Sequence, residues 1–141
     1  MKIVIVTGEK KSGKTTYLKT ISKETFSGVI TECINRKERK YQFNLINKNK
    51  KLLCCYYDNG MKFNQDNFDI VNDYLMEINN KNIIIDEIGW LELKKSGLYK
   101  ALKSILKQKD VENLYISMRF DIYKELIKKF NIVDYELINL S

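Results

Sequence analysis

The chain has 141 residues, of which 44% are hydrophobic, so we expect one domain with one ordinary core. Histidine is absent and the three cysteines lack zinc-binding spacing, which excludes a histidine metal site, a histidine general base and a disulfide framework. The net charge of +7 comes from residues 1–70, with 14 basic and 7 acidic side chains, since residues 71–141 carry 11 of each. This basic half suits a polyphosphate ligand and would also attract nucleic acid, although no motif indicates nucleic-acid binding. A solvated lysine-rich surface is the simpler explanation of the charge.

The apolar runs are short. The N-terminal run Ile3–Val6 is too short for a signal peptide, and no run approaches the length of a membrane span. We therefore expect a cytoplasmic protein without a membrane partner, with a monomer favoured. The cysteines, Cys33, Cys54 and Cys55, are expected to be small buried residues in strands.

The first half of the chain begins with a strand and a helix. The β-branched run Lys2–Val6 predicts a buried strand that Thr7-Gly8 ends, and helical spacing of apolar residues predicts a helix over Lys14–Ser22. Three short strands separated by charged or Asn-Lys turns are then predicted, at Gly28–Thr31, Tyr41–Ile46 and Leu52–Tyr57. Because nothing helical separates them, we expect an antiparallel insert around residues 28–58.

The second half alternates helices with strands. The predicted elements, in chain order, are a helix over Asp66–Ile78, a strand at Ile83–Ile85, a helix from Ser96 to about Lys107 with Ser96 as its cap, a strand at Leu114–Ile116, a helix over Ile122–Lys129 and a strand at Val133–Ile138. Buried strands that alternate with amphipathic helices predict an α/β fold. We expect a mostly parallel sheet flanked by helices, formed by residues 1–141 as a single domain.

A phosphate-binding motif lies between the first strand and the first helix. Residues Gly8–Thr15 read Gly-Glu-Lys-Lys-Ser-Gly-Lys-Thr, which fits the P-loop (Walker A) pattern GxxxxGK[ST] in the context that its mechanism requires. Lys14 would neutralise the β- and γ-phosphates, and Thr15 would offer its hydroxyl to Mg²⁺. The residues expected to bind a nucleoside triphosphate such as ATP or GTP are Gly8, Glu9, Lys10, Lys11, Ser12, Gly13, Lys14, Thr15 and Thr16.

A second motif follows the strand at Ile83–Ile85. Asp86 at its carboxyl end occupies the position at which P-loop proteins hold Mg²⁺ (Walker B), so Asp86 and Thr15 are the expected metal residues. Glu87 is placed to orient or deprotonate an attacking water. The stretch Asp86–Gly89 also fits the DxxG pattern, in which the Gly89 N–H meets the γ-phosphate, although a tight turn explains this glycine equally well. The guanine-reading NKxD motif is missing.

Arginine occurs only at Arg36, Arg39 and Arg119. A cation must stabilise charge on a transferred γ-phosphoryl group, and Arg119 follows a core strand that ends at the same edge as Asp86. Arg119 is therefore the candidate catalytic cation beside Lys14 and Glu87, with a solvated arginine as the alternative. Trp90, the only tryptophan, is expected to pack against the Asp-Glu loop rather than to stack on a base.

These segments together resemble the family of small nucleoside triphosphatases that includes human cancer-related nucleoside triphosphatase and its bacterial and archaeal relatives. Asp86–Leu93 is similar to the family's Asp-Glu-Ile-Gly-x-x-Glu-Leu signature, and Gly28–Glu32 with Arg39 and Phe43 is similar to its second segment. The resemblance implies a RecA-like P-loop core and slow Mg²⁺-dependent hydrolysis of several nucleoside triphosphates to diphosphate and phosphate, with broad base preference.

Two other functions stay open. One is a nucleotide-binding switch or accessory module with little catalysis, which fits departures from the family pattern such as Gln42 in place of a glycine. The other is a small nucleotide or nucleoside kinase. A kinase would need a phosphoryl-acceptor site lined by several arginines, and three arginines scattered along the sequence argue against one.

Overall fold

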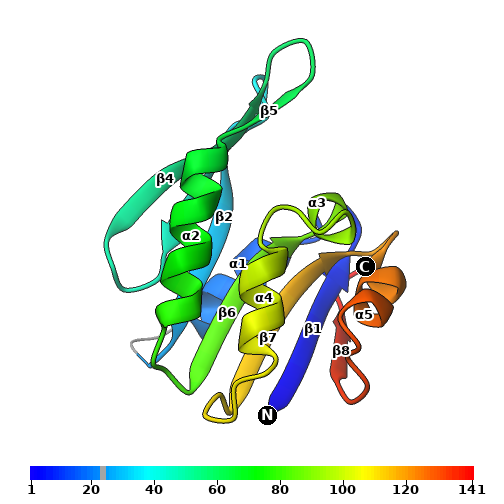
Figure 1. The fold of residues 1–141 in the computed structure, drawn as a ribbon. Coiled ribbons are helices and arrows are strands. Elements are labelled where there is room, and N and C mark those ends of the chain that lie inside the picture. Colours follow the sequence, from blue (N-terminus) through cyan, green and yellow to red (C-terminus); the bar gives the residue numbers. More distant parts are fainter. Residues whose placement is uncertain (23–24) are drawn as a thin grey trace.

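The strands form one mixed sheet. Within the described residues, 1–22 and 25–141 of this computed structural model, eight strands are ordered β5-β4-β3-β2-β6-β7-β1-β8 (Figure 1). The strands are β1 (Lys2–Gly8), β2 (Ser27–Asn35), β3 (Lys40–Leu45), β4 (Lys50–Tyr57), β5 (Met61–Phe63), β6 (Asn82–Ile88), β7 (Asn113–Arg119) and β8 (Glu136–Asn139). The helices are α1 (Lys14–Ile21), α2 (Gln65–Glu77), α3 (Trp90–Leu93), α4 (Tyr99–Ile105) and α5 (Tyr123–Lys129).

The sheet has a parallel part and an antiparallel part that share β2. The pairs from β2 through β6, β7 and β1 to β8 are parallel, whereas β2 to β5 pair antiparallel. The predicted α/β fold with an antiparallel insert is thus confirmed. The insert is continuous with the main sheet, because β2 pairs with β6 through Ser27–Val29 and with β3 along most of its length. It also extends beyond residue 58, since β5 adds a short edge strand.

The parallel strands bring distant residues to one edge of the sheet. β7 lies between β1 and β6, and Gly8 at the end of β1 is in register with Arg119 at the end of β7. β6 ends beside them, and Asp86 and Glu87 are among its last three residues. In open α/β sheets, ligands bind outside the carboxyl ends of the strands, so this edge is where a site is expected.

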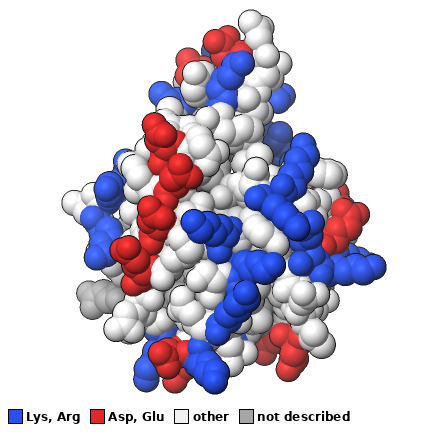
Figure 2. Space-filling view, viewed as in Figure 1, with Lys and Arg blue, Asp and Glu red and all other residues white. Residues whose placement is uncertain are grey.

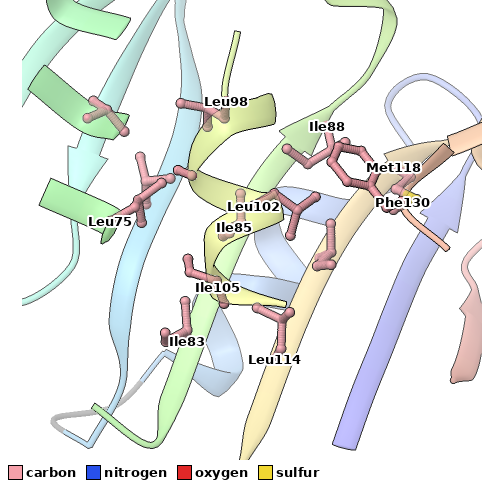
Figure 3. Close-up of a cluster of buried hydrophobic side chains, with 14 of the residues drawn as sticks. Leu75, Ile83, Ile85, Ile88, Leu98, Leu102, Ile105, Leu114, Met118 and Phe130 are labelled. Atoms are coloured by element: carbon pink, nitrogen blue, oxygen red, sulfur yellow. The ribbon is translucent and has the colours of Figure 1, made fainter. Parts of the chain in front are cut away.

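The core has two layers because side chains alternate along each strand. Ile83 and Ile85 of β6 pack in the larger cluster under α2, α4 and α5, whereas Ile84 packs in the smaller cluster under α1. Figure 3 shows the larger cluster, in which Leu102 and Ile105 of α4 lie over the sheet. Burial on both faces explains why the central strands read as continuous apolar runs.

Some elements differ from the sequence prediction. α4 begins at Tyr99 rather than at Ser96, because residues 96–98 form a turn whose Leu98 N–H donates to the buried carboxylate of Glu92. The last strand is Glu136–Asn139, since Val133 is 90% exposed and lies outside it. Cys54 and Cys55 are buried as expected, but Cys33 is exposed.

The surface carries both signs of charge. Figure 2 shows a row of acidic side chains where α2 lies, beside an area of basic side chains, on one face of the molecule. The exposed acids of α2 recur at helical spacing, at Asp66, Asp69, Asp73 and Glu77. That face is therefore not uniformly basic. No helix among the described residues is both long enough and apolar enough to cross a membrane.

Candidate nucleotide site

The P-loop is a tight turn between β1 and α1. Lys11 (φ 65°) and Gly13 (φ 93°) have left-handed backbone conformations, and the Ser12 N–H donates to the Glu9 carbonyl at 3.0 Å. A chain in this conformation turns successive N–H groups to one side and forms an anion-binding concavity. A Cβ on Gly13 would meet no atom within 4 Å, so glycine is needed there for its φ rather than for space.

Lys14 lies over the same loop. Its Nζ donates to the carbonyls of Gly8 at 3.0 Å and of Glu9 at 3.2 Å. The ammonium group is therefore held at the mouth of the concavity by neutral acceptors. Phosphate oxygens are stronger acceptors for an ammonium group than these carbonyls are, so Lys14 is free to exchange partners when an anion binds.

Asp86 joins three strands of the sheet and the P-loop helix. Its side chain is fully buried, and its Oδ2 accepts the Thr15 hydroxyl at 2.8 Å and the Thr31 N–H at 3.1 Å. Its Oδ1 accepts the hydroxyl of Ser117 on β7. Burial raises the pKa of Asp86 and the hydrogen bonds from Ser117, Thr15 and Thr31 oppose that rise.

Glu87 has an unusual backbone for a glutamate. Its φ is 64°, and its N–H donates to Ser117 Oγ at 2.7 Å. Strained residues of this kind cluster at functional sites. The side chain is exposed along the cleft although protein surrounds it on the other sides, and desolvation followed by the charge of Asp86 raises its pKa to about 7, against the lowering effect of Lys14 and Arg119. A carboxylate with a pKa near neutrality is suited to accept a proton.

A cleft of about 850 Å³ opens along this edge of the sheet. Its walls are the P-loop, the ends of β2 and β6, the β2–β3 turn and the segment after β7. The lining residues are Gly8, Glu9, Lys10, Lys11, Ser12, Gly13, Lys14, Thr15, Thr16, Thr31, Glu32, Cys33, Arg36, Arg39, Tyr41, Glu87, Arg119, Phe120 and Asp121. The structure thus brings every residue expected to bind phosphate together with Glu87 and Arg119, and Asp86 lies beneath the cleft floor.

All three arginines line this cleft, which corrects the view that they are scattered. Arg119 forms an ion pair with Asp121, at 3.2 Å from Nε to Oδ1. Arg39 lies over the ring of Tyr57, with 5.0 Å between the guanidinium carbon and the ring centroid. Within the described part of the chain, the Arg36 side chain forms no ion pair or hydrogen bond. The β2–β3 turn therefore contributes two cationic residues, Arg36 and Arg39, to the lining of the cleft.

The sequence left two interpretations open for each of two further residues of the signature stretch, Gly89 and Trp90. The Gly89 N–H donates to Glu92 Oε1 at 2.7 Å, so the turn interpretation of this glycine is supported and its N–H is already occupied. Trp90 is 49% exposed at the start of α3, so it packs less fully than expected. It is not among the residues that line the cleft.

Several polar residues of the site were not singled out from the sequence. Ser117 bridges Asp86 and the Glu87 N–H, and Thr31 donates its N–H to Asp86. Glu92 is 3% exposed and links α3 to the start of α4. Asp86 was identified as a polar residue at the carboxyl end of a predicted buried strand. The same criterion could have identified Thr31 and Ser117, which end or follow predicted strands.

The oxygen donors of the site fit a hard divalent cation. Thr15 offers a hydroxyl oxygen and Asp86 a carboxylate oxygen, which is the donor chemistry that Mg²⁺ prefers in combination with water and phosphate. Among the described residues there is no group of three His, Cys, Asp or Glu side chains that could hold a metal alone. A P-loop site does not need one, because the nucleotide supplies further oxygen ligands.

Comparisons with known proteins agree with this geometry. A family model described as NTPase matches residues 3–140. The crystal structure of THEP1 from the hyperthermophile Aquifex aeolicus has a TM-score of 0.75 at 22% identity, covering 99% of this chain and 90% of that one. The solution structure of a human cancer-related nucleoside triphosphatase has a TM-score of 0.74 at 16% identity, covering 99% and 88%. No curated protein sequence matches significantly. The expected P-loop fold and the family resemblance are confirmed, and the chain belongs to the NTPase family.

Proposed function

We propose that this protein hydrolyses nucleoside triphosphates to the diphosphate and phosphate in a Mg²⁺-dependent reaction. The observation that carries the proposal is the hydrogen bond between Thr15 and Asp86 with Glu87 adjacent, because it joins the phosphate loop to two acidic groups. Family membership supports the same activity.

The phosphate-binding residues are Gly8 to Thr16. The loop N–H groups and the N-terminus of α1 would bind the β- and γ-phosphates, with Lys14 exchanging its two carbonyl partners for phosphate oxygens. Thr15 and Asp86 would hold Mg²⁺, which when bound neutralises charge on the transferred phosphoryl group. The expected role of Thr16 is contact with the α-phosphate.

Glu87 is the proposed base and Arg119 the proposed cation. Glu87 is exposed along the cleft with its pKa near neutrality, which suits removal of a proton from water. Arg119 ends the strand that is in register with Gly8 of the P-loop, so it is close to the phosphate site. Its present partner is Asp121, and it would have to leave that ion pair to stabilise the transition state.

Broad base preference and slow turnover belong to the same proposal. The sequence has no guanine-reading motif, and the cationic residues that line the cleft would bind phosphates rather than a base. A cytoplasmic monomer also stays a prediction, which cell fractionation and size-exclusion chromatography would check.

The test is phosphate release from ATP, GTP, CTP and UTP by purified protein with Mg²⁺. Wild type should release phosphate from several of them, whereas Lys14→Ala should lose binding and Glu87→Gln should bind without turnover. Wild-type release no greater than that of Glu87→Gln would contradict hydrolysis. Tight nucleotide binding with that result would instead favour the switch or accessory module.

A small kinase is the second enzymatic candidate. The positions of the arginines in the structure favour it more than their positions along the sequence did. Arg36, Arg39 and Arg119 share one cleft, where they could bind the phosphate of an acceptor. A coupled assay for ADP with and without nucleosides and nucleoside monophosphates separates the two activities. Acceptor-dependent ADP formation would favour the kinase, and acceptor-independent formation would favour hydrolysis.

A further inference from the structure

Thr31 on β2 carries a buried hydroxyl that has no partner among the described residues. The residue is 6% exposed, and its Oγ1 forms no hydrogen bond. Two other buried hydroxyls at the same edge have partners, since Thr7 Oγ1 donates to the Met118 carbonyl at 3.0 Å and Ser117 donates to Asp86. Because an unpaired buried hydroxyl is costly and rare, it calls for a specific explanation such as a bound ligand atom.

Two other buried polar atoms of the described residues also lack partners, and each differs from the Thr31 hydroxyl. Ser12 Oγ lies beneath the P-loop, 2.3 Å from where a Cβ on Gly8 would stand, so it is enclosed by its own loop. Asn44 lacks a partner only at Oδ1, since its Nδ2 donates to Glu32. Thr31 differs from both because it is a nearly fully buried residue that also lines the cleft.

The backbone of Thr31 is held by the two nucleotide motifs. Its N–H donates to Asp86 Oδ2 at 3.1 Å, and its carbonyl accepts the Thr15 hydroxyl at 3.5 Å. Val29 of β2 and Ile85 of β6 are the last residues that pair between these parallel strands, and Thr31 and Glu87 each lie two residues further along their strand. Both residues line the same cleft.

We propose that the Thr31 hydroxyl, together with the Glu87 carboxylate, holds the water that attacks the γ-phosphate. This proposal rests on the hydrolytic function proposed above. The water oxygen would form a bond to the γ-phosphorus while the bond from that phosphorus to the bridging oxygen breaks. The proton of the water passes to Glu87, and the electron pair of the broken bond stays on the β-phosphate of the departing diphosphate.

Two contacts on the water explain why Glu87 alone is insufficient. A carboxylate accepts the proton but leaves the water free to rotate about that single hydrogen bond, whereas a second fixed group defines the direction of its lone pair. A hydroxyl can donate to or accept from water, and here it is fixed by a strand backbone that is itself bound to Asp86. Thr31 would thus increase turnover without contributing to nucleotide affinity.

The test compares Thr31→Val, which removes the hydroxyl at nearly constant shape, with Thr31→Ser, which keeps it. For Mg²⁺-ATP hydrolysis, we expect Thr31→Val to lower kcat about 10- to 100-fold, on the scale of misplaced reactants, and to leave the Kd for Mg²⁺-ATP within about twofold. Thr31→Ser should retain kcat within about threefold. The nucleotide-free Tm of Thr31→Val should equal or exceed that of wild type, because a methyl group replaces an unpaired buried hydroxyl.

The outcomes separate the two proposals. If wild type hydrolyses ATP and Thr31→Val has the same kcat, the inference is wrong and the proposed function stands. If Thr31→Val weakens nucleotide binding as much as it lowers kcat, the hydroxyl binds the nucleotide and the water-holding role is overturned. If wild type shows no turnover above Glu87→Gln, both proposals fail together.

Discussion

The Thr15 hydroxyl donates a hydrogen bond of 2.8 Å to Asp86 Oδ2, across 71 positions of the sequence. This contact joins the first turn of α1 to β6, although β7 lies between β6 and the P-loop strand in the sheet. Since Asp86 also accepts from Thr31 on β2 and Ser117 on β7, one buried carboxylate fixes the relative positions of four elements. The fold itself therefore assembles the two oxygens that we propose hold Mg²⁺.

Replacing Asp86 with asparagine should separate metal binding from phosphate binding. Asn lacks the charge that attracts Mg²⁺, so we expect Mg²⁺ to lose most of its contribution to ATP affinity, a loss of about tenfold or more, while ATP binding in EDTA changes little. Calorimetric titration with ATP, with and without Mg²⁺, measures both quantities. Asp73→Asn, at an exposed position of α2, is the control and should retain the wild-type response. An unchanged Mg²⁺ contribution in Asp86→Asn would contradict the metal role.

Arg119 should matter for turnover more than for binding. If it supplies positive charge to the transition state, Arg119→Ala lowers kcat by about 100-fold or more and changes KM much less. Arg36→Ala is the matched control, because Arg36 lines the same cleft and its side chain forms no ion pair or hydrogen bond with the described residues. It should lower kcat by less than about tenfold. A larger effect of Arg36 than of Arg119 would transfer the role to the β2–β3 turn.

The sequence predicted the part of the candidate site that is built from contiguous residues, which the structure brings together. The P-loop and the Asp86-Glu87 pair are local motifs placed at strand ends, so pattern and context were sufficient. The arginines were misjudged because their meeting depends on how the β2–β3 turn lies over the cleft, which no local pattern specifies. β5 and α3 were missed for another reason, since segments of 3 and 4 residues are too short for periodicity to identify.

Glu92 should make folding stability depend on pH. Desolvation raises its pKa to about 7, despite hydrogen bonds from the Gly89 and Leu98 N–H groups. In the unfolded chain the group ionises near its ordinary value of about 4.3. Its contribution to stability is therefore greatest below that value, and it falls by up to about 3 kcal/mol as pH rises to the folded pKa near 7.

Urea unfolding of wild type and Glu92→Gln at pH values from about 4 to 9 checks this prediction. The difference between the two free energies of unfolding removes the titrations that both proteins share. Wild type should lose stability relative to Glu92→Gln between about pH 4.3 and 7, and the difference should be constant above about pH 8. Parallel profiles across the whole range would show that the folded pKa of Glu92 is not raised.

Gly28 should tolerate no side chain, for two reasons: its positive φ and the close approach of a neighbouring strand. A second glycine, Gly60, shares only the positive φ and so separates the two effects. Gly28 has φ 131° and Gly60 has φ 121°, conformations that cost an alanine about 1–3 kcal/mol. A Cβ at Gly28 would also stand 1.9 Å from the Ile84 carbonyl oxygen, whereas one at Gly60 meets nothing within 4 Å. Because Ser27–Val29 pairs with β6 in the centre of the sheet, relief of that overlap requires the two strands to move apart. We expect Gly60→Ala to lose about 1–3 kcal/mol in urea unfolding and Gly28→Ala to lose more than about 4 kcal/mol or to remain unfolded. Equal losses would mean that backbone conformation alone explains the glycine at both positions.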